Sequence, residues 1–140
     1  SPMTLQEAFH AYMIAQAAVS GLLGTRLYPE IAPTDTPLPY CTYMVPSDVP
    51  IYHMTGAAGI ANAHIAVDVW AENEPSRTRV AKTLQAALEQ WVLSGSISPG
   101  IAVRFAGLET QEDSFVAPSD GSERGVYQRT LDLNIWYKSA

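Results

Sequence analysis

The segment HIAVDVW, residues 64–70, decides the fold, because large aliphatic side chains occupy every second position. Ile65, Val67 and Val69 share one parity, and the residues between them are polar, small or aromatic. Successive side chains of a β-strand point to opposite faces of the sheet. The alternation therefore predicts a strand with one face buried against a core.

A second segment, TLDLNIWY at residues 130–137, repeats this pattern with Leu131, Leu133 and Ile135 on one parity. The tetrapeptides VDVW and LNIW within the two segments are alike, which indicates related strands of one sheet. Two further strands are predicted at residues 40–45 and 101–106, and a short edge strand is predicted at residues 25–28.

A helix is predicted before these strands. Thr4 and Glu7 have the spacing of a capping box, in which the two side chains satisfy free amide groups at a helix start. Gly21 or Gly24 is expected to end the helix. Apolar residues recur at steps of three and four, which gives the helix one buried stripe. That stripe consists of Leu5, Ala8, Phe9, Tyr12, Ala15 and Val19.

A second helix is predicted after the tripeptide 73–75, because Pro75 fits the first turn of a helix, and it is expected to stop near Gly95. Its buried stripe consists of Val80, Leu84, Ala87, Leu88 and Trp91. With helices and strands segregated in this order, the predicted class is α+β: two main helices packed on one face of a largely antiparallel β-sheet.

Two segments, 46–59 and 111–125, do not fit the periodic pattern. Both are rich in Gly, Pro, Ser and Asp, so they are predicted as long, hairpin-like connections. Connections of this length in a small domain are usually functional or disordered. We expect them to become ordered when a neighbouring subunit covers them.

The length of 140 residues, 47% of them hydrophobic, suits one compact domain with a continuous core. The expected domain spans residues 3–140, and Ser1 and Pro2 ahead of Met3 are interpreted as the remnant of a cleaved tag. No apolar run approaches the roughly 18 residues of a membrane span, and no export signal is visible, so synthesis in a reducing cytoplasm and no membrane contact are expected.

The charge balance argues against tight binding of nucleic acid. There are 14 acidic and 8 basic side chains, which gives a formal net charge of −6. DNA and RNA binding draws its affinity from clustered Lys and Arg. The single cysteine, Cys41, excludes an intrachain disulfide and a cage of thiolates around a metal.

No catalytic or cofactor motif is apparent. His10, His53 and His64 are too scattered to show metal-ligand spacing, and GAAG at residues 56–59 lacks the Lys and the following helix of a phosphate-binding loop. Cys41 lies in a predicted strand and is interpreted as a small buried hydrophobe. We therefore expect no catalytic residues, no metal and no cofactor.

Asp68 and Asp132 occupy the non-core parity of their strands and could lie near one another. Paired carboxylates can perform acid–base chemistry, but a solvated sheet face is the ordinary interpretation. Trp70 and Trp136 share this parity. Large aromatic side chains on such a face indicate that something covers them, either a helix of the same chain or another subunit.

Five segments of the chain resemble, in their order and spacing, those of the tail-completion proteins of long-tailed phages. This family belongs with the head-to-tail connector and tail-terminator proteins. The resemblance extends from about Leu5 to Tyr137. The segments are GLLGTRLYPEIAPTDTPLPYCTYMV (21–45), TGAAGIANAHIAVDVWAEN (55–73), SRTRVAKTLQAALEQW (76–91), GLETQEDSF (107–115) and YQRTLDLNIWYK (127–138).

The resemblance implies a structural virion protein that terminates the tail tube at the head-proximal end and takes part in head-to-tail joining. It implies a cyclic homo-oligomer, expected to be a hexamer, that contacts the tail-tube protein and a head-completion or connector protein while DNA passes through without specific binding. Residues 27–29 and 37–40 would then form a stiff connection from the first helix into the sheet, since proline restricts the backbone.

On this interpretation, Asp68 and Asp132 are candidates for facing the lumen of the ring. The candidate subunit contacts are Tyr52, His53, Met54, Trp70, Phe115 and Trp136. Two alternatives stay open. One is a small-ligand-binding or enzymatic domain that uses Asp68, Asp132 and His64 on the open sheet face, and the other is a different minor tail or portal adaptor protein.

Overall fold

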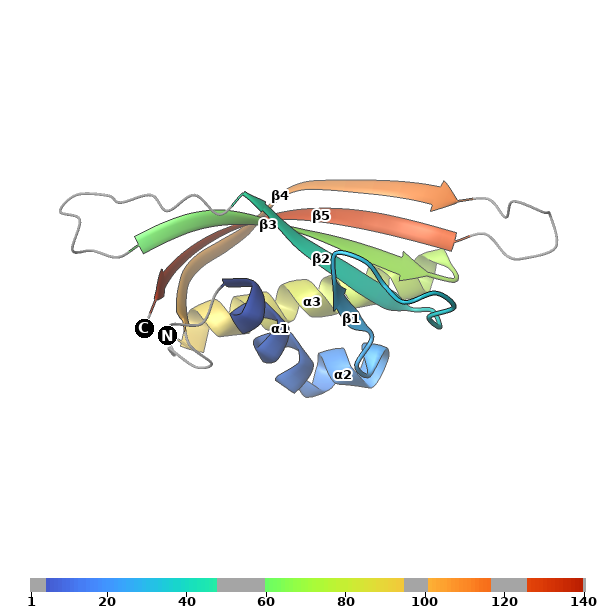
Figure 1. The fold of residues 1–140 in the computed structure, drawn as a ribbon, viewed down its shortest axis with the longest axis horizontal. Helices are drawn as coiled ribbons and strands as arrows, with labels where there is room; N and C mark the ends of the chain where they lie inside the picture. The colour runs from blue at the N-terminus through green and yellow to red at the C-terminus, as the bar shows by residue number, and fades with distance from the viewer. Residues whose placement is uncertain (1–4, 48–59, 95–100, 117–125, 140) are drawn as a thin grey trace.

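The computed structural model describes residues 5–47, 60–94, 101–116 and 126–139, and its helices all lie on one face of a sheet (Figure 1). This arrangement confirms the α+β class. The elements in chain order are α1 (Leu5–Ala15), α2 (Ala17–Leu23), β1 (Leu27–Pro29), β2 (Tyr40–Ser47), β3 (Ile60–Ala71), α3 (Glu74–Ser94), β4 (Ile101–Val116) and β5 (Val126–Ser139).

The described strands form one five-stranded sheet in the order β1-β2-β3-β5-β4. β1 runs parallel to β2, and the other neighbouring strands are antiparallel. β3 and β5, which contain the two alternating segments, pair from Ile60 opposite Lys138 to Ala71 opposite Tyr127. The two clearest sequence patterns therefore lie at the centre of the sheet, where both neighbours fix their register.

The core lies between the sheet and the helices, as the alternation predicts. Ile65, Val67 and Val69 of β3 are fully buried on this side. The ring of Trp91 stacks on Tyr12 with 4.3 Å between ring centroids, which ties α3 to α1. No helix among the described ranges has the combination of length and apolar character that a membrane span needs.

The first helical segment is broken, whereas the sequence predicts one continuous helix. Gln16 adopts extended backbone angles (φ −81°, ψ 121°), which separates α1 from α2. The Gln16 side chain donates to the carbonyl of Tyr12, one of the acceptors left open at the end of α1. α2 ends at Gly24, which has a positive φ of 60°, as expected for a glycine there. Thr4 of the predicted capping box lies outside the described residues.

The second predicted helix is confirmed as α3, with Ser94 as its last residue. Its start is capped by Asn73, whose side-chain oxygen accepts a hydrogen bond from the amide of Ser76 at 2.8 Å. The predicted stripe is buried. This stripe holds α3 against the sheet.

The prediction of a connection over residues 111–125 is wrong in its first part, because Gln111–Val116 continue β4. They pair with Leu131–Val126 of β5 in an antiparallel ladder. Gln111, Glu112, Asp113 and Ser114 are exposed, so their polar character reflects an edge strand and not a loop. Residues 117–125 lie outside the described part of the chain, as do residues 48–59 of the other predicted connection.

The proline-rich connection between β1 and β2 is held at both ends. Arg26 donates from Nε to the carbonyl of Pro39 at 2.9 Å, and the amide of Glu30 donates to the carbonyl of Tyr43 at 2.8 Å. Glu30 and Asp35 have positive φ values of 65° and 64°. The segment thus leads the chain from α2 into the sheet by a defined path.

Candidate functional site

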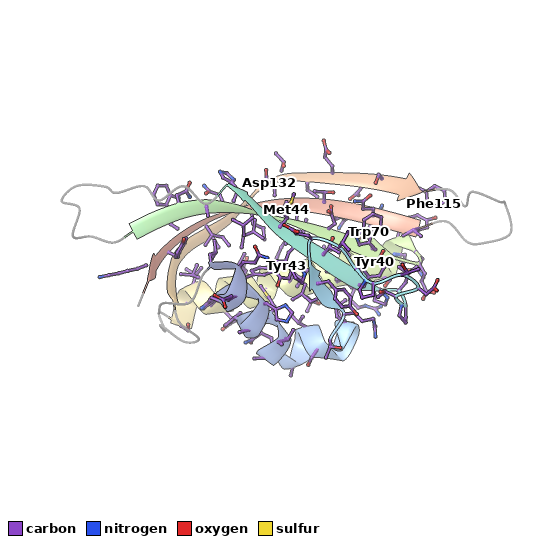
Figure 2. The ribbon with its side chains drawn as sticks, viewed as in Figure 1. Tyr40, Tyr43, Met44, Trp70, Phe115 and Asp132 are labelled. Atoms are coloured by element: carbon purple, nitrogen blue, oxygen red, sulfur yellow. The ribbon has the colours of Figure 1, made fainter. Side chains whose placement is uncertain are left out.

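The sheet face opposite the helices, called the open face below, is the candidate site, because no described helix covers it (Figure 1). Figure 2 shows Met44 and Asp132 on this side of the sheet and Tyr43 on the helix side. The alternation of side chains along β2, β3 and β5 gives the open face its residues. They include Tyr40, Thr42, Met44, Asn62, His64, Ala66, Asp68, Trp70, Gln128, Thr130, Asp132, Asn134, Trp136 and Lys138.

Asp68 lies near the middle of the open face and is held by its neighbours on β5. Thr130, directly opposite in the β3–β5 register, donates its hydroxyl to Asp68 Oδ1 at 2.5 Å. Gln128 donates from Nε2 to the same oxygen at 3.2 Å. These bonds give the carboxylate polar partners within the sheet, as is typical of a structural carboxylate.

Asp132 shares the open face with Asp68, but its neighbour is His64. Oδ1 of Asp132 lies 3.7 Å from Nδ1 of His64, and this contact is an ion pair only when the imidazole is protonated. Both side chains are more than one third exposed. Water therefore screens the interaction.

The two aspartates share a face but have different hydrogen-bond and ion-pair partners among the described contacts. Asp68 accepts hydrogen bonds from Thr130 and Gln128, whereas Asp132 approaches His64. Within the described ranges, no group of three or more His, Cys, Asp or Glu side chains could hold a metal ion.

The aromatic residues of the open face lie away from the described helices. The ring of Trp70 stacks on Tyr40 of β2, with centroids 5.9 Å apart and an angle of 18° between the ring planes. The indole nitrogen of Trp70 is buried and has no hydrogen-bond partner among the described residues. Trp136 lies opposite Asn62 in the β3–β5 register. No described helix covers either tryptophan. Of the two covers considered from the sequence, a helix of the same chain or another subunit, the described helices are therefore excluded.

Phe115 is not on the open face. It lies near the end of edge strand β4, on the helix side, where its ring meets Tyr127 edge-on at 5.0 Å. The Phe115 side chain is 53% exposed. The remaining candidate contacts, Tyr52, His53 and Met54, lie outside the described residues.

Cys41 and His10, which were also considered from the sequence, lie in surroundings typical of structural residues. Cys41 is fully buried, and burial together with the nearby Asp68 charge raises the pKa of its thiol far above the usual range. His10 has its Nδ1 3.0 Å from the hydroxyl of Tyr43, so it is a satisfied histidine at the edge of the core. Neither arrangement favours nucleophilic or acid–base chemistry.

A charged cluster on the helix side was missed by sequence reasoning. Arg129 of β5 donates two hydrogen bonds to Asp113 of β4, and Arg77 of α3 lies 3.4 Å from the same carboxylate. Glu74 lies 3.6 Å from Arg129. Arg77 also donates to the carbonyl oxygens of Ser114 and Gln128, and both arginines are only 8% exposed. The cluster fastens the start of α3 to the β4–β5 pair.

A sequence signal for this cluster exists. Arg77 is three residues before Val80 on the buried stripe of α3, and Arg129 has the same parity as Leu131 on β5. A charged residue at a core position is rarely fully buried unless it is paired. The hydrogen bond from Arg129 is the main cause that lowers the pKa of the Asp113 carboxyl, and the two arginine charges add to it.

Comparison with known proteins gives one family and a similar structure. The family described as "Tail completion protein gp17" matches residues 7–138. A chain in the solved structure "Virion of native gene transfer agent (GTA) particle" is 15% identical, with a TM-score of 0.61, and the match covers 96% of this chain and 95% of that one. At this identity the likeness shows a shared fold. No curated protein matches. Since the family match spans almost the whole chain, the protein belongs to the tail completion protein gp17 family.

Proposed function

We propose that this protein is a structural component of a phage tail that caps the tail tube at its head-proximal end and presents the surface to which the filled head docks. The observation that carries the proposal is the match to a family of tail completion proteins over residues 7–138. The fold shared with a chain of a phage-like virion particle supports it. The working form is a ring of six copies.

The open face is proposed to line the passage for DNA. Asp68 and Asp132 lie on it, and Glu112 of β4 is paired with Thr130 on the same face. Lys138, near the end of β5, has the same parity, so the three carboxylates outnumber it. The arginines Arg77 and Arg129, in contrast, are on the helix side and are neutralised by Asp113 and Glu74. A passage lined with carboxylates repels the DNA backbone, so DNA moves through without being held.

Contacts between subunits and with the tail-tube and head-connector proteins are proposed for aromatic residues of the sheet. Trp70 and Trp136 lack a described helix above them, and Phe115 is half exposed at a sheet edge. Tyr52, His53 and Met54 belong to the same proposal. Large aromatic side chains are enriched in interfaces and often dominate their binding energy.

The experiment is deletion of the gene from its phage, followed by electron microscopy of the lysate. Loss of a tail-capping protein should leave heads filled with DNA beside unjoined tails, many of irregular length. The matched control is the deleted phage supplied with the wild-type gene on a plasmid, which should restore joined particles. Joined particles with tails of normal length in the deletion strain would refute the proposal.

The same particles can distinguish a tail cap from a portal-side adaptor or another minor tail protein. An epitope at the C-terminus, detected with gold-labelled antibody, should mark the head-proximal end of free tails. Label on isolated heads would identify a portal-side adaptor, and label along the tube would identify a different tail component.

A further inference from the structure

A hollow lies between helix α3 and edge strand β4, on the helix side of the sheet. Its volume is about 200 Å³. Leu88 of α3 and Leu133 of β5, both almost fully buried, form an apolar floor. Leu108 of β4, which is 41% exposed, adds apolar surface at the side. The hollow therefore offers apolar contact to a side chain that enters from outside.

The rest of the lining is partly polar. Gln85 and Glu89 of α3 both line the hollow, and side chains four residues apart are neighbours on a helix surface. Gln85 is half-buried and Glu89 is exposed, and neither side chain has a hydrogen bond or an ion pair among the described residues. The Glu89 carboxylate is the only charged group in the described lining. The hollow thus presents unused hydrogen-bond acceptors and one negative charge.

The nearest basic residue of α3 does not neutralise this charge. Lys82 is seven residues before Glu89 and does not line the hollow. Seven residues of α-helix span about 10 Å, which is about one Debye length at 0.1 M salt. Water and salt therefore screen the attraction between the two side chains, and Glu89 is left to pair with a cation from outside the chain.

An apolar floor beside an unpaired carboxylate suits a long basic side chain. Lysine and arginine bury their aliphatic stems against apolar surface and keep the charged end with polar partners. Arginine suits this hollow better, because its planar guanidinium group carries N–H donors for both Glu89 and Gln85. The volume equals that of about seven water molecules at about 30 Å³ each, roughly the size of the seven non-hydrogen atoms of an arginine side chain.

We infer that the hollow between α3 and β4 receives an arginine side chain of a second structural protein of the particle. This inference rests on the proposed function, because it names a contact by which the protein holds a partner. The chain itself has 14 acidic and only 8 basic side chains, so a basic partner is the complementary one.

Another copy of the chain is a poor source of this arginine. Among the arginine side chains that the structure describes, Arg26, Arg77 and Arg129 already donate hydrogen bonds within the chain. The other described one, Arg79, lies on α3 itself. The inference therefore commits to an arginine of a different protein.

The first test is photo-cross-linking in assembled particles. The phage lacking the gene is supplied with a variant in which p-benzoylphenylalanine replaces Gln85, and purified joined particles are irradiated. We expect a covalent adduct with a different virion protein, and an arginine in the attached peptide that mass spectrometry identifies after cleavage with chymotrypsin. The matched control is the same replacement at Gln90, which is exposed on the same helix but does not line the hollow. It should give no adduct with that peptide.

A charge exchange tests the arginine itself. Glu89→Arg places like charges together, so the yield of joined particles should fall at least about tenfold. Replacement of the partner's cross-linked arginine by glutamate should restore the yield. Glu72→Arg, the control, makes the same change of charge at an exposed residue outside the lining and should leave the yield unchanged. Both purified variants should keep the wild-type unfolding midpoint, because both side chains are exposed.

Several outcomes would overturn the inference while the proposed function stands. They are an adduct with another copy of this chain, no adduct from Gln85 in joined particles, an unchanged yield with Glu89→Arg, and an exchange that restores nothing. Normally joined particles from the strain without the gene would instead refute the proposed function, and the inference with it.

Discussion

Arg129 and Asp113 form two hydrogen bonds across the β5–β4 pair, 2.6 Å from Nε to Oδ1 and 3.1 Å from Nη2 to Oδ2. Arg129 is almost buried, whereas the Asp113 side chain is 39% exposed. The carboxylate also faces Arg77. A half-exposed acid thus holds two buried guanidinium groups, one from the sheet and one from α3.

Asp113→Asn should lower the free energy of unfolding by about 1–3 kcal/mol, because two charge-assisted hydrogen bonds are weakened and the arginines lose their counter-charge. The value is below that of a fully buried pair, since water screens the exposed side of the carboxylate. Urea denaturation measures the change. Asp132→Asn is the matched control: its side chain is 38% exposed and contacts only His64 among the described salt bridges. Equal losses in the two variants would contradict this role for Asp113.

The contribution of Asp113 should depend on pH. Its pKa in the folded protein lies below the ordinary value of 3.8. A lowered pKa means that the unfolded chain binds the proton more readily, so the stabilisation is complete above about pH 5 and disappears as the pH falls through the folded pKa. The stability difference between wild type and Asp113→Asn should therefore shrink as the pH falls from about 5 to about 2, because such a carboxyl titrates in this range. A constant difference across this range would be the contrary result.

The core prediction concerns α3. Leu88→Ala should cost about 2–5 kcal/mol, as expected for a large-to-small change at a position that is 4% exposed. Leu93→Ala, on the same helix and 76% exposed, should change stability by less than about 0.5 kcal/mol. Thermal or urea unfolding of both variants measures the contrast, and similar midpoints would show that α3 packs differently.

Cys41 should be chemically inert in the native protein. Its thiol is fully buried, and burial raises its pKa, so almost no thiolate exists at neutral pH. A thiol reagent such as 5,5′-dithiobis(2-nitrobenzoate) should react at the rate of unfolding and should react at once in denaturant. Rapid labelling of the folded chain would show that β2 opens or that Cys41 is accessible.

The sequence predicts the parts of this fold where one periodicity dominates. Period-two alternation places Ile65 and Leu131 in the core, and Trp91 ends a clear helical stripe. Periodicity does not predict the break at Gln16, because the apolar stripe continues through it. The break is visible only in the local backbone angles. Periodicity also fails at residues 111–116, because a polar edge strand exposed on both faces has no apolar alternation and is recognised only by its pairing with β5.

The sequence predicts which side chains share a face of the sheet, but not which of them contact one another. Parity places Asp68 and Trp70 on the same side as Asp132, and the structure agrees. Parity does not give partners, which depend on register, so the bond from Thr130 to Asp68 could not be predicted.

The last prediction tests whether the open face lines a passage for DNA. Asp132→Lys changes the charge of each copy by +2 on that face, and Glu7→Lys makes the same change on α1, in the helix layer. If the open face surrounds the DNA, six added lysines in a ring should bind duplex DNA, with an affinity that falls steeply as salt rises. The Glu7→Lys ring, with the same net charge, should bind at least about tenfold more weakly, because its lysines would point away from the passage.

Fluorescence anisotropy of a labelled duplex measures the dissociation constants of both variants. The salt concentration is varied from about 50 to about 200 mM, where counterion release dominates binding. Native mass spectrometry checks whether each variant forms the proposed ring. Equal binding by the two variants would show that only net charge matters, and stronger binding by Glu7→Lys would place the helix layer at the lumen instead.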